Sequence, residues 1–328
     1  MQGKSKHSLS VLALVLVAAI WGFGYLGVQN AIDGGWSSLG ILAFRGVVGG
    51  GLCLIFSFKE KWWKNKKFLY GAILSGAITF IGYLVQTEGQ KRTSIPNCAF
   101  FTALNVVMVP FIAAIFFKDK LRFKTIVAAV ISLVGVGVLS FTGSEFSLQI
   151  GDLFNFIGAL CFAIQIAYMG KLSKYNSPFG LAGVQLMVMG ILGLIIMPFF
   201  GGEQHFGSGG WLGIIYVAVV SSFIAFFLQA ACQQNVNSGT TAVIIAQEST
   251  FGTLFSVLLM HSPVTWNLLV GGSIVVLSVL IASVNFNFKK RKKVLEPVTV
   301  TDKADLDLDD MGIETYVILD DIENDSKK

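Results

Sequence analysis

The chain has 328 residues, of which 54% are hydrophobic and only 13% are charged. Its mean hydropathy is +0.71. This composition excludes an ordinary soluble domain, because a soluble core does not need so many long apolar runs. The net charge of +5 would also suit a nucleic-acid-binding protein. The positive charges fall in short connections between apolar segments, however, so we expect no nucleic-acid partner.

Ten apolar segments follow one another between Leu9 and Phe288. A helix needs about 20 apolar residues to cross a bilayer, and continuous apolar runs favour helices over barrel strands. The sequence therefore predicts an all-α integral membrane protein with ten transmembrane helices. The first run is longer than the apolar part of a signal peptide, so we expect it to be retained as a helix. The predicted segments are 9–29, 37–57, 68–89, 95–117, 122–142, 151–172, 178–200, 210–234, 239–260 and 264–286.

Lysine and arginine predict the orientation, because they accumulate in short cytoplasmic loops. With the N-terminus inside, 18 of the 20 loop lysines and arginines face the cytoplasm, and only Lys91 and Arg92 face outward. An odd number of spans would move the cluster Lys289–Lys293 to the outside. The charge pattern therefore favours an even number of spans and two cytoplasmic termini.

The last part of the chain, residues 289–328, differs in character from the rest. After the basic cluster it contains eleven Asp and Glu against three Lys. Such a segment cannot bury enough apolar surface to fold alone. We expect a solvated cytoplasmic tail; the alternative is that its negative charge folds back on Lys289–Lys293.

An internal repeat is indicated when the sequence is shifted by 143 positions. Gln86 then falls on Gln229 and Gln90 on Gln233, and the helix boundaries also coincide. We expect one five-helix repeat in residues 1–143 and a second in 144–288. Because five is odd, the second repeat must be inverted in the membrane, which places a substrate site near the midplane between the halves.

Polar side chains at membrane depth are informative because they cost free energy there. Arg45 lies near the middle of the second segment and Glu248 near the middle of the ninth. A central Arg costs about 2.5–3.5 kcal/mol on insertion scales, so it should face the bundle or a wet cavity. Asn105 is the counterpart of Glu248 under the same shift. Either these residues form a substrate or coupling site, or Arg45 and Glu248 only neutralise each other.

Further candidates complete the predicted site. Gln86 and Gln229 either line a cavity or hydrogen-bond between helices, and the same alternatives hold for Gln233. Gln247 adjoins Glu248, while Trp21 and Tyr25 flank a glycine-rich part of the first helix. Glu88, near a helix end beside Lys91 and Arg92, is expected to be an interfacial carboxylate.

No pattern of catalytic, cofactor-binding or metal-binding residues is present. The four cysteines occur singly inside apolar segments, and the three histidines fall in termini or loops. There is no CxxC, HExxH, GxSxG or phosphate-binding motif. We therefore expect no catalytic residues, no cofactor and no metal, and the chain is not expected to be an enzyme.

Several motifs resemble the drug/metabolite transporter superfamily, specifically the EamA type. They are Trp21-Gly22, the mid-helix Arg45, Val109-Pro110, Phe117–Leu121 and Gly135-Val136-Gly137. The resemblance covers residues 9–286. Ser249 departs from it, since proline is common at that position in the family.

The resemblance implies a secondary carrier in the plasma membrane. It implies transport of small metabolites, often export of amino acids or their analogues, by alternating access. Without an ATP-binding motif, a proton or counter-substrate gradient must supply the driving force. The alternatives are a membrane sensor whose acidic tail recruits a partner, an embedded enzyme, and a passive channel.

Overall fold

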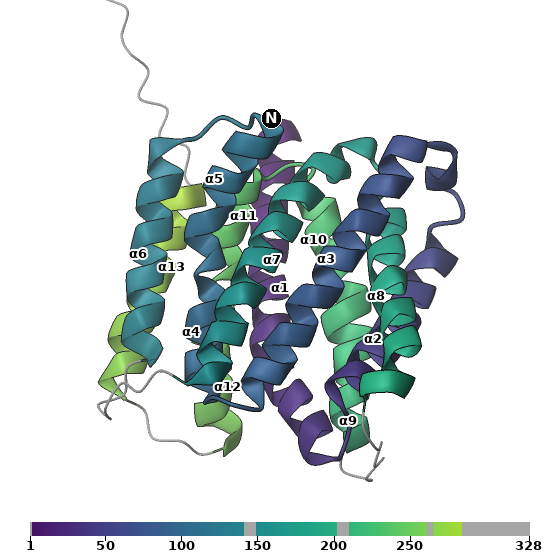
Figure 1. Ribbon diagram of the computed structural model, residues 1–328. Coiled ribbons are helices and arrows are strands. Elements are labelled where there is room, and N and C mark those ends of the chain that lie inside the picture. Colours follow the sequence, from purple (N-terminus) through teal and green to yellow (C-terminus); the bar gives the residue numbers. More distant parts are fainter. Residues whose placement is uncertain (1, 141–148, 202–209, 261–264, 284–328) are drawn as a thin grey trace, which may run out of the picture. The chain divides into compact units, whose positions relative to one another are not determined.

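The computed structural model describes residues 2–140, 149–201, 210–260 and 265–283, and these ranges form helices joined by short turns (Figure 1). The tail, the Lys289–Lys293 cluster, His205 and His261 lie outside the described residues. The predictions made for them therefore stay predictions.

Within the described ranges, ten helices or runs of joined helices are long and apolar enough to cross a membrane, and each coincides with a predicted segment. The all-α fold class with ten transmembrane helices is thus confirmed. The first five spans are α1 (Gln2–Asp33), α2 (Ser38–Phe56), α3 (Lys66–Gln90), α4 (Ile95–Ala103) with α5 (Asn105–Phe117), and α6 (Phe123–Ser140). The second five are α7 (Ile150–Leu172), α8 (Pro178–Phe200), α9 (Gly210–Ile215) with η3 (Tyr216–Ile224) and α10 (Ala225–Cys232), α11 (Ser238–Ile245) with α12 (Glu248–Met260), and α13 (Trp266–Ser283). Two short 3₁₀ turns, η1 (Trp62–Lys64) and η2 (Ser173–Tyr175), lie in connections.

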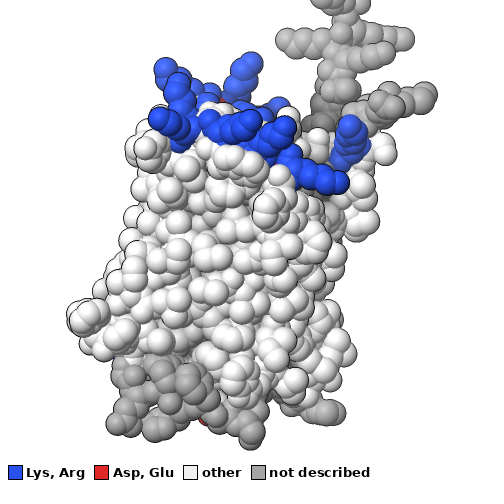
Figure 2. All heavy atoms as spheres, turned by 90° about the vertical axis from the view of Figure 1, so that its right-hand side faces the viewer, with Lys and Arg blue, Asp and Glu red and all other residues white. Residues whose placement is uncertain are grey.

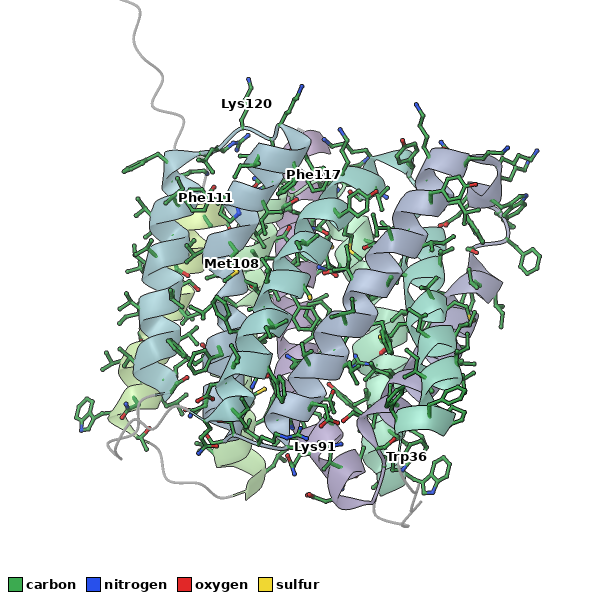
Figure 3. The ribbon with its side chains drawn as sticks, in the orientation of Figure 1. Trp36, Lys91, Met108, Phe111, Phe117 and Lys120 are labelled. Atoms are coloured by element: carbon green, nitrogen blue, oxygen red, sulfur yellow. The ribbon has the colours of Figure 1, made fainter. Side chains whose placement is uncertain are left out.

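The outward faces of these helices are apolar. Leu12, Phe116 and Leu212 are 66%, 72% and 81% exposed. In water such exposure would be unfavourable, but in a bilayer it is covered by acyl chains. Figure 2 shows lysine and arginine gathered at one end of the molecule, above an uncharged belt. We call this the basic end; Lys120 lies there and Lys91 lies at the opposite end (Figure 3).

Corresponding helices of the two halves pack in matching pairs. α2 packs on α8, and α6 packs on α13. α3 packs on α7, and in the same way α1 packs on α9, η3 and α10. The α2–α8 pair is close because glycines meet at the crossing: a Cβ added to Gly46 would lie 2.3 Å from the Gly190 nitrogen. Small residues at such crossings let membrane helices approach without a gap.

The fourth and ninth spans are each broken near their middle. The first break is at Leu104, between α4 and α5, and the second is at Ala246 and Gln247, between α11 and α12. The polar caps of the two spans also correspond, since Ser94 caps α4 and Asn237 caps α11, 143 positions later. The two spans run in opposite directions, because α5 lies above α4 whereas α12 lies below α11 (Figure 1). Asn105 and Glu248 begin the second helix after each break.

Candidate functional site

A pocket of about 60 Å³ lies between helices of both halves. Six of the eight predicted site residues line it: Trp21, Tyr25, Arg45, Gln86, Asn105 and Glu248. These residues come from α1, α2, α3, α5 and α12. The folding of the chain therefore brings together side chains that are as much as 227 positions apart in sequence, from Trp21 to Glu248.

Arg45 lines the pocket and is only 2% exposed. Its Nε donates a hydrogen bond to the Ser222 hydroxyl at 2.9 Å. Its guanidinium carbon lies 3.9 Å from the centroid of the Tyr83 ring. A cation over an aromatic face is worth about 2 kcal/mol when both are desolvated. Ser222 belongs to η3, a π-helical stretch, and such stretches are frequent at functional sites.

Glu248 lines the same pocket from the start of α12 and is 7% exposed. The positive end of a helix stabilises a negative charge there. The Tyr25 hydroxyl donates to its carboxylate at 3.3 Å. Gln86 in turn donates to Tyr25 at 3.4 Å and to the Thr102 hydroxyl at 3.2 Å. A chain of polar contacts thus connects α4, α3 and α1 to the carboxylate.

The two buried charges do not neutralise each other directly. Arg45 and Glu248 line the same pocket but form no ion pair with each other. The ion pairs that the described residues do show join Glu88 to Lys91 and Arg92. The structure therefore does not show the alternative in which Arg45 and Glu248 only neutralise each other in an ion pair. The guanidinium of Arg45 and the carboxyl group of Glu248 thus both line one small cavity without an ion pair between them.

Aromatic rings form much of the remaining wall. Trp21 packs edge-on against Phe226 with ring centroids 5.6 Å apart, and its indole nitrogen donates to the Ser221 carbonyl at 2.9 Å. Tyr83 packs edge-on against Phe162 at 4.9 Å. The packed rings give the pocket an apolar wall, and a charge interaction beside such a wall is stronger than the same interaction in water.

Two predicted residues lie elsewhere. Gln229 and Gln247 are buried but do not line the pocket. Gln229 lies on α10 less than one turn beyond Phe226, which takes the pocket face of that helix. Gln247 lies in the break before α12. Gln233 also lies away from the pocket and hydrogen-bonds between helices, donating to the Ile166 carbonyl at 3.1 Å.

Several pocket residues were not predicted. They are Tyr83, Phe162, Phe226, Gln165, Thr102 and Ser221, among others. The aromatic residues carry no signal, because a ring in an apolar segment packs against lipid or core as often as it lines a site. Gln165 did carry one: it is an amide near the middle of an apolar segment, as Gln86 is, and the same argument would have selected it.

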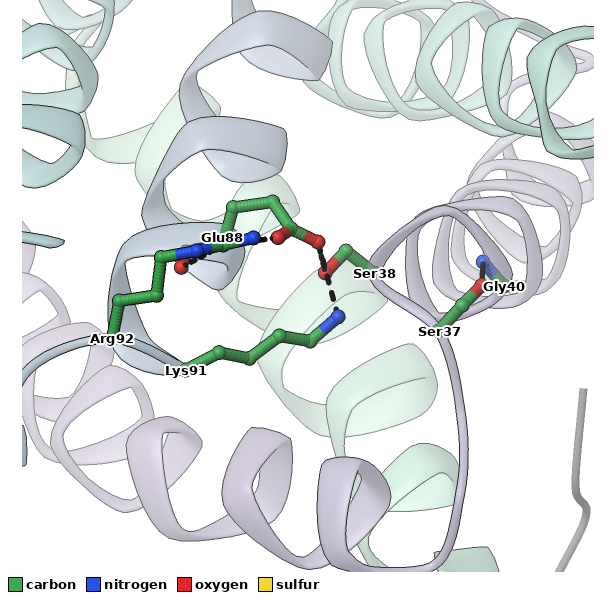
Figure 4. A network of polar contacts seen from close by, with 6 residues as sticks. All are labelled: Ser37, Ser38, Gly40, Glu88, Lys91 and Arg92. Carbon is green, nitrogen blue, oxygen red and sulfur yellow. Dashed lines mark hydrogen bonds and ion pairs between the residues drawn. The ribbon is translucent and has the colours of Figure 1, made fainter. Parts of the chain in front are cut away.

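Glu88 lies at an end of α3 and connects it to the start of α2 (Figure 4). Its carboxylate accepts hydrogen bonds from Ser38, Lys91 and Arg92, the Lys91 contact being 3.0 Å. This agrees with the interfacial role expected for it. Glu88 does not line the central pocket.

Ten apolar spans around a buried polar pocket define a multi-pass α-helical membrane protein. Among the described residues there is no group of His, Cys, Asp and Glu that could hold a metal ion. The model of the EamA-like transporter family matches residues 8–141 and again residues 149–284. The chain therefore belongs to this family, and it is a membrane transporter.

Individual relatives agree with this assignment. An uncharacterized transporter of Archaeoglobus fulgidus is 30% identical over 279 residues, which is 85% of this chain and 87% of the relative. The uncharacterized transporter YdfC of Bacillus subtilis is 22% identical over 223 residues, covering 66% and 71%. A solved crystal structure superposes with a TM-score of 0.68 at 14% identity, covering 85% of this chain and 96% of the other. At that identity, it bears on the fold alone.

Proposed function

We propose that the protein is a secondary transporter of small zwitterionic metabolites, such as amino acids or their analogues, that works by alternating access and exports its substrate. The observation that carries this proposal is the presence of Arg45 and Glu248 on one pocket without an ion pair between them. A zwitterion offers each of them an opposite charge. It would replace the water that each charge loses in this buried site.

The residues around the two charges suit these roles. Ser222 accepts the hydrogen bond from the Nε of Arg45. The edge of the planar guanidinium formed by its two terminal nitrogens would then bind a carboxylate in a bidentate manner. Glu248 would accept from an ammonium group, with Tyr25 holding its carboxylate in place. The rings of Trp21 and Phe162 would contact the apolar part of the substrate.

The pocket must change size during the transport cycle. Its volume of about 60 Å³ is well below the 300 Å³ or more typical of ligand sites. The breaks that precede Asn105 and Glu248 are the positions at which the fourth and ninth spans can bend. Broken helices at the midplane of two inverted repeats are a recurring way to build such a site, and the matching helix pairs support this arrangement in the present chain.

Coupling is proposed to involve a proton or a counter-substrate. Glu248 is the pocket group that can exchange a proton, and we assign it that role. The orientation, with both termini in the cytoplasm of a plasma-membrane protein, rests on the basic end of the molecule. The cytoplasm would then meet the Lys120 side.

A binding screen tests the substrate class. Purified protein would be screened by thermal shift against amino acids, sugars and nucleosides. Any hit would then be compared with its decarboxylated amine and its deaminated acid. We expect an amino acid to raise Tm, with both analogues at least ten-fold weaker, since each leaves one buried charge unpaired. Equal binding of the amine or the acid would contradict a zwitterionic substrate.

A further inference from the structure

A hydrogen bond made by Arg45 in the first half has a matching bond in the second. Thr79 and Ser222 correspond under the shift of 143 positions. Arg45 donates to Ser222, and Gln185 donates to Thr79 at 2.7 Å. The two acceptors correspond, and the two donors lie on the paired helices α2 and α8. Gln185 therefore makes the bond in the second half that corresponds to the bond of the pocket arginine, from one helical turn before Val188, the residue that the shift places opposite Arg45.

Two glutamines of α3, one of α10 and the residue that follows α10 form two more matched positions. Gln90 donates to a main-chain carbonyl of α1 at 3.0 Å, and Gln233 donates to a main-chain carbonyl of α7 at 3.1 Å. One turn earlier, Gln86 corresponds to Gln229. The first-half members of both pairs line the central pocket, whereas the second-half members do not.

These second-half counterparts share an unusual property. Gln229 has no hydrogen-bond partner for either amide atom, and the Oε1 atoms of Gln185 and Gln233 also have none among the described residues. Gln185 and Gln229 are 0% exposed, and Gln233 is 4% exposed. A buried amide without a partner loses its hydration and gains no hydrogen bond in return, which destabilises the fold. Such groups are rare in native structures and require an explanation.

A second cavity reaches this region from the basic end. It has a volume of about 470 Å³, and Lys120 and Lys174 contribute to its lining. Gln233 also lines it. Gln90, its counterpart, lines the central pocket at the end of α3 that leads to Lys91. Each glutamine of this matched pair thus lines a cavity, the two cavities reaching toward opposite ends of the molecule.

We propose that Gln229 and Gln233 line the substrate path when the protein opens toward the basic end, taking the places that Gln86 and Gln90 have in this structure. In that conformation α10 has the position beside the substrate path that α3 has in this structure. The second cavity then extends by one helical turn, from Gln233 to Gln229. The amide of Gln229 then hydrogen-bonds to substrate or water. The inference rests on the proposed alternating access, and it assigns Gln229 and Gln233 as specificity-determining residues of the second state.

Cysteine accessibility tests this assignment. The four native cysteines would first be replaced by serine, and single cysteines introduced as Gln229→Cys, Gln86→Cys and Lys120→Cys. Vesicles of both orientations would be treated with a membrane-impermeant methanethiosulfonate, with Lys120→Cys marking the basic end. We expect Gln229→Cys to react at least ten-fold faster from the Lys120 side, and Gln86→Cys to show the opposite preference. Ala230→Cys is the matched control, since Ala230 is equally buried on the same helix but packs in the core and should not react.

The outcomes separate this inference from the proposed function. If the wild-type protein transports while Gln229→Cys stays unreactive from both sides, or reacts from the Gln86 side, the assignment is overturned and transport stands. If the Gln229→Cys variant does not accumulate in the membrane, a stability measurement on a second variant tests the assignment instead. We expect Gln229→Leu to raise Tm by about 2 °C or more, because an unpaired amide is removed, and to slow exchange at least ten-fold. A fall in Tm with unchanged exchange would make Gln229 a structural residue only.

Discussion

A charged side chain inside a bilayer needs partners that offset the free-energy cost of its lost hydration. The partners of Arg45 are a hydroxyl and an aromatic ring rather than an opposite charge. Its guanidinium is held by one hydroxyl and one aromatic ring, while Glu248 is held by a phenol. The sequence predicted that these two residues matter, because ionisable groups at membrane depth are costly. It did not predict the rings of Tyr83 and Phe226, since apolar side chains give no such signal.

The role of Arg45 can be tested by removing its charge or only its shape. We expect Arg45→Ala to abolish transport while the protein still inserts and folds. Arg45→Lys should lose most of the activity, because an ammonium cannot reproduce the planar fork. Arg92→Ala is the control, since Arg92 is an exposed cation outside the pocket. Initial uptake rates in proteoliposomes would measure this, and normal uptake by both Arg45 variants would assign the residue to structure.

Glu248 gives a separate test of coupling. An amide has the shape of the carboxylate but cannot bind and release a proton. We therefore expect Glu248→Gln to retain exchange of substrate across the membrane, at a higher substrate concentration because the ammonium group loses its charged partner, while losing the dependence of net flux on a pH gradient. Flux would be measured with imposed gradients of either sign. Gradient dependence and substrate affinity equal to those of the wild type would remove Glu248 from the mechanism.

At the scale of elements, hydropathy predicted where the spans lie but not how they are built. The segments 95–117 and 239–260 were predicted as single helices, and both contain a break. Each break depends on a few backbone hydrogen bonds, near Leu104 in one span and near Gln247 in the other. Hydropathy averaged over a window of apolar residues does not detect such a local change. The sequence did predict Asn105 and Glu248 as matched polar positions. The breaks explain why polar residues occur there, because each of the two residues begins the helix that follows a break.

The close approach of α2 and α8 provides a test on one helix. A Cβ at Gly46 would lie 2.3 Å from a Gly190 backbone atom, whereas a Cβ at Gly51 would meet only the end of the Met187 side chain at 3.9 Å. We expect Gly46→Ala to destabilise the protein by about 1–3 kcal/mol. Gly51→Ala should be neutral or slightly stabilising, by up to about 1 kcal/mol. Thermal unfolding in detergent distinguishes them, and equal Tm values would refute the packing described for this crossing.

For the whole molecule, the number of spans was predictable because lipid imposes a minimum helix length, and charge then predicts a direction. The positions of Lys120 and Lys91 at opposite ends agree with that pattern (Figure 3). The arrangement of the helices around the pocket was not predictable, because it depends on glycine crossings and ring contacts between segments distant in sequence. The repeat of 143 positions was the one long-range signal available, and the caps Ser94 and Asn237 follow it.

Orientation can be measured at two positions that lie outside the described residues. In a cysteine-free background, Ser144→Cys should be labelled by an impermeant reagent applied to intact cells, since it lies in a predicted outer loop. Ser326→Cys should be labelled only after the cells are opened, because the tail is expected in the cytoplasm. Labelling of both positions in intact cells would contradict the proposed topology.

Entrance counterflow in proteoliposomes tests most directly whether this protein is an alternating-access carrier. Vesicles loaded with an excess of the unlabelled amino acid found by thermal shift would be diluted into a trace of the same labelled compound. A carrier predicts transient accumulation of label above its external concentration, and saturation as that concentration rises. Label that only equilibrates, with an ionic conductance far above carrier turnover, would indicate a channel. No entry of a compound that binds would indicate a sensor, and either result would contradict transport by alternating access.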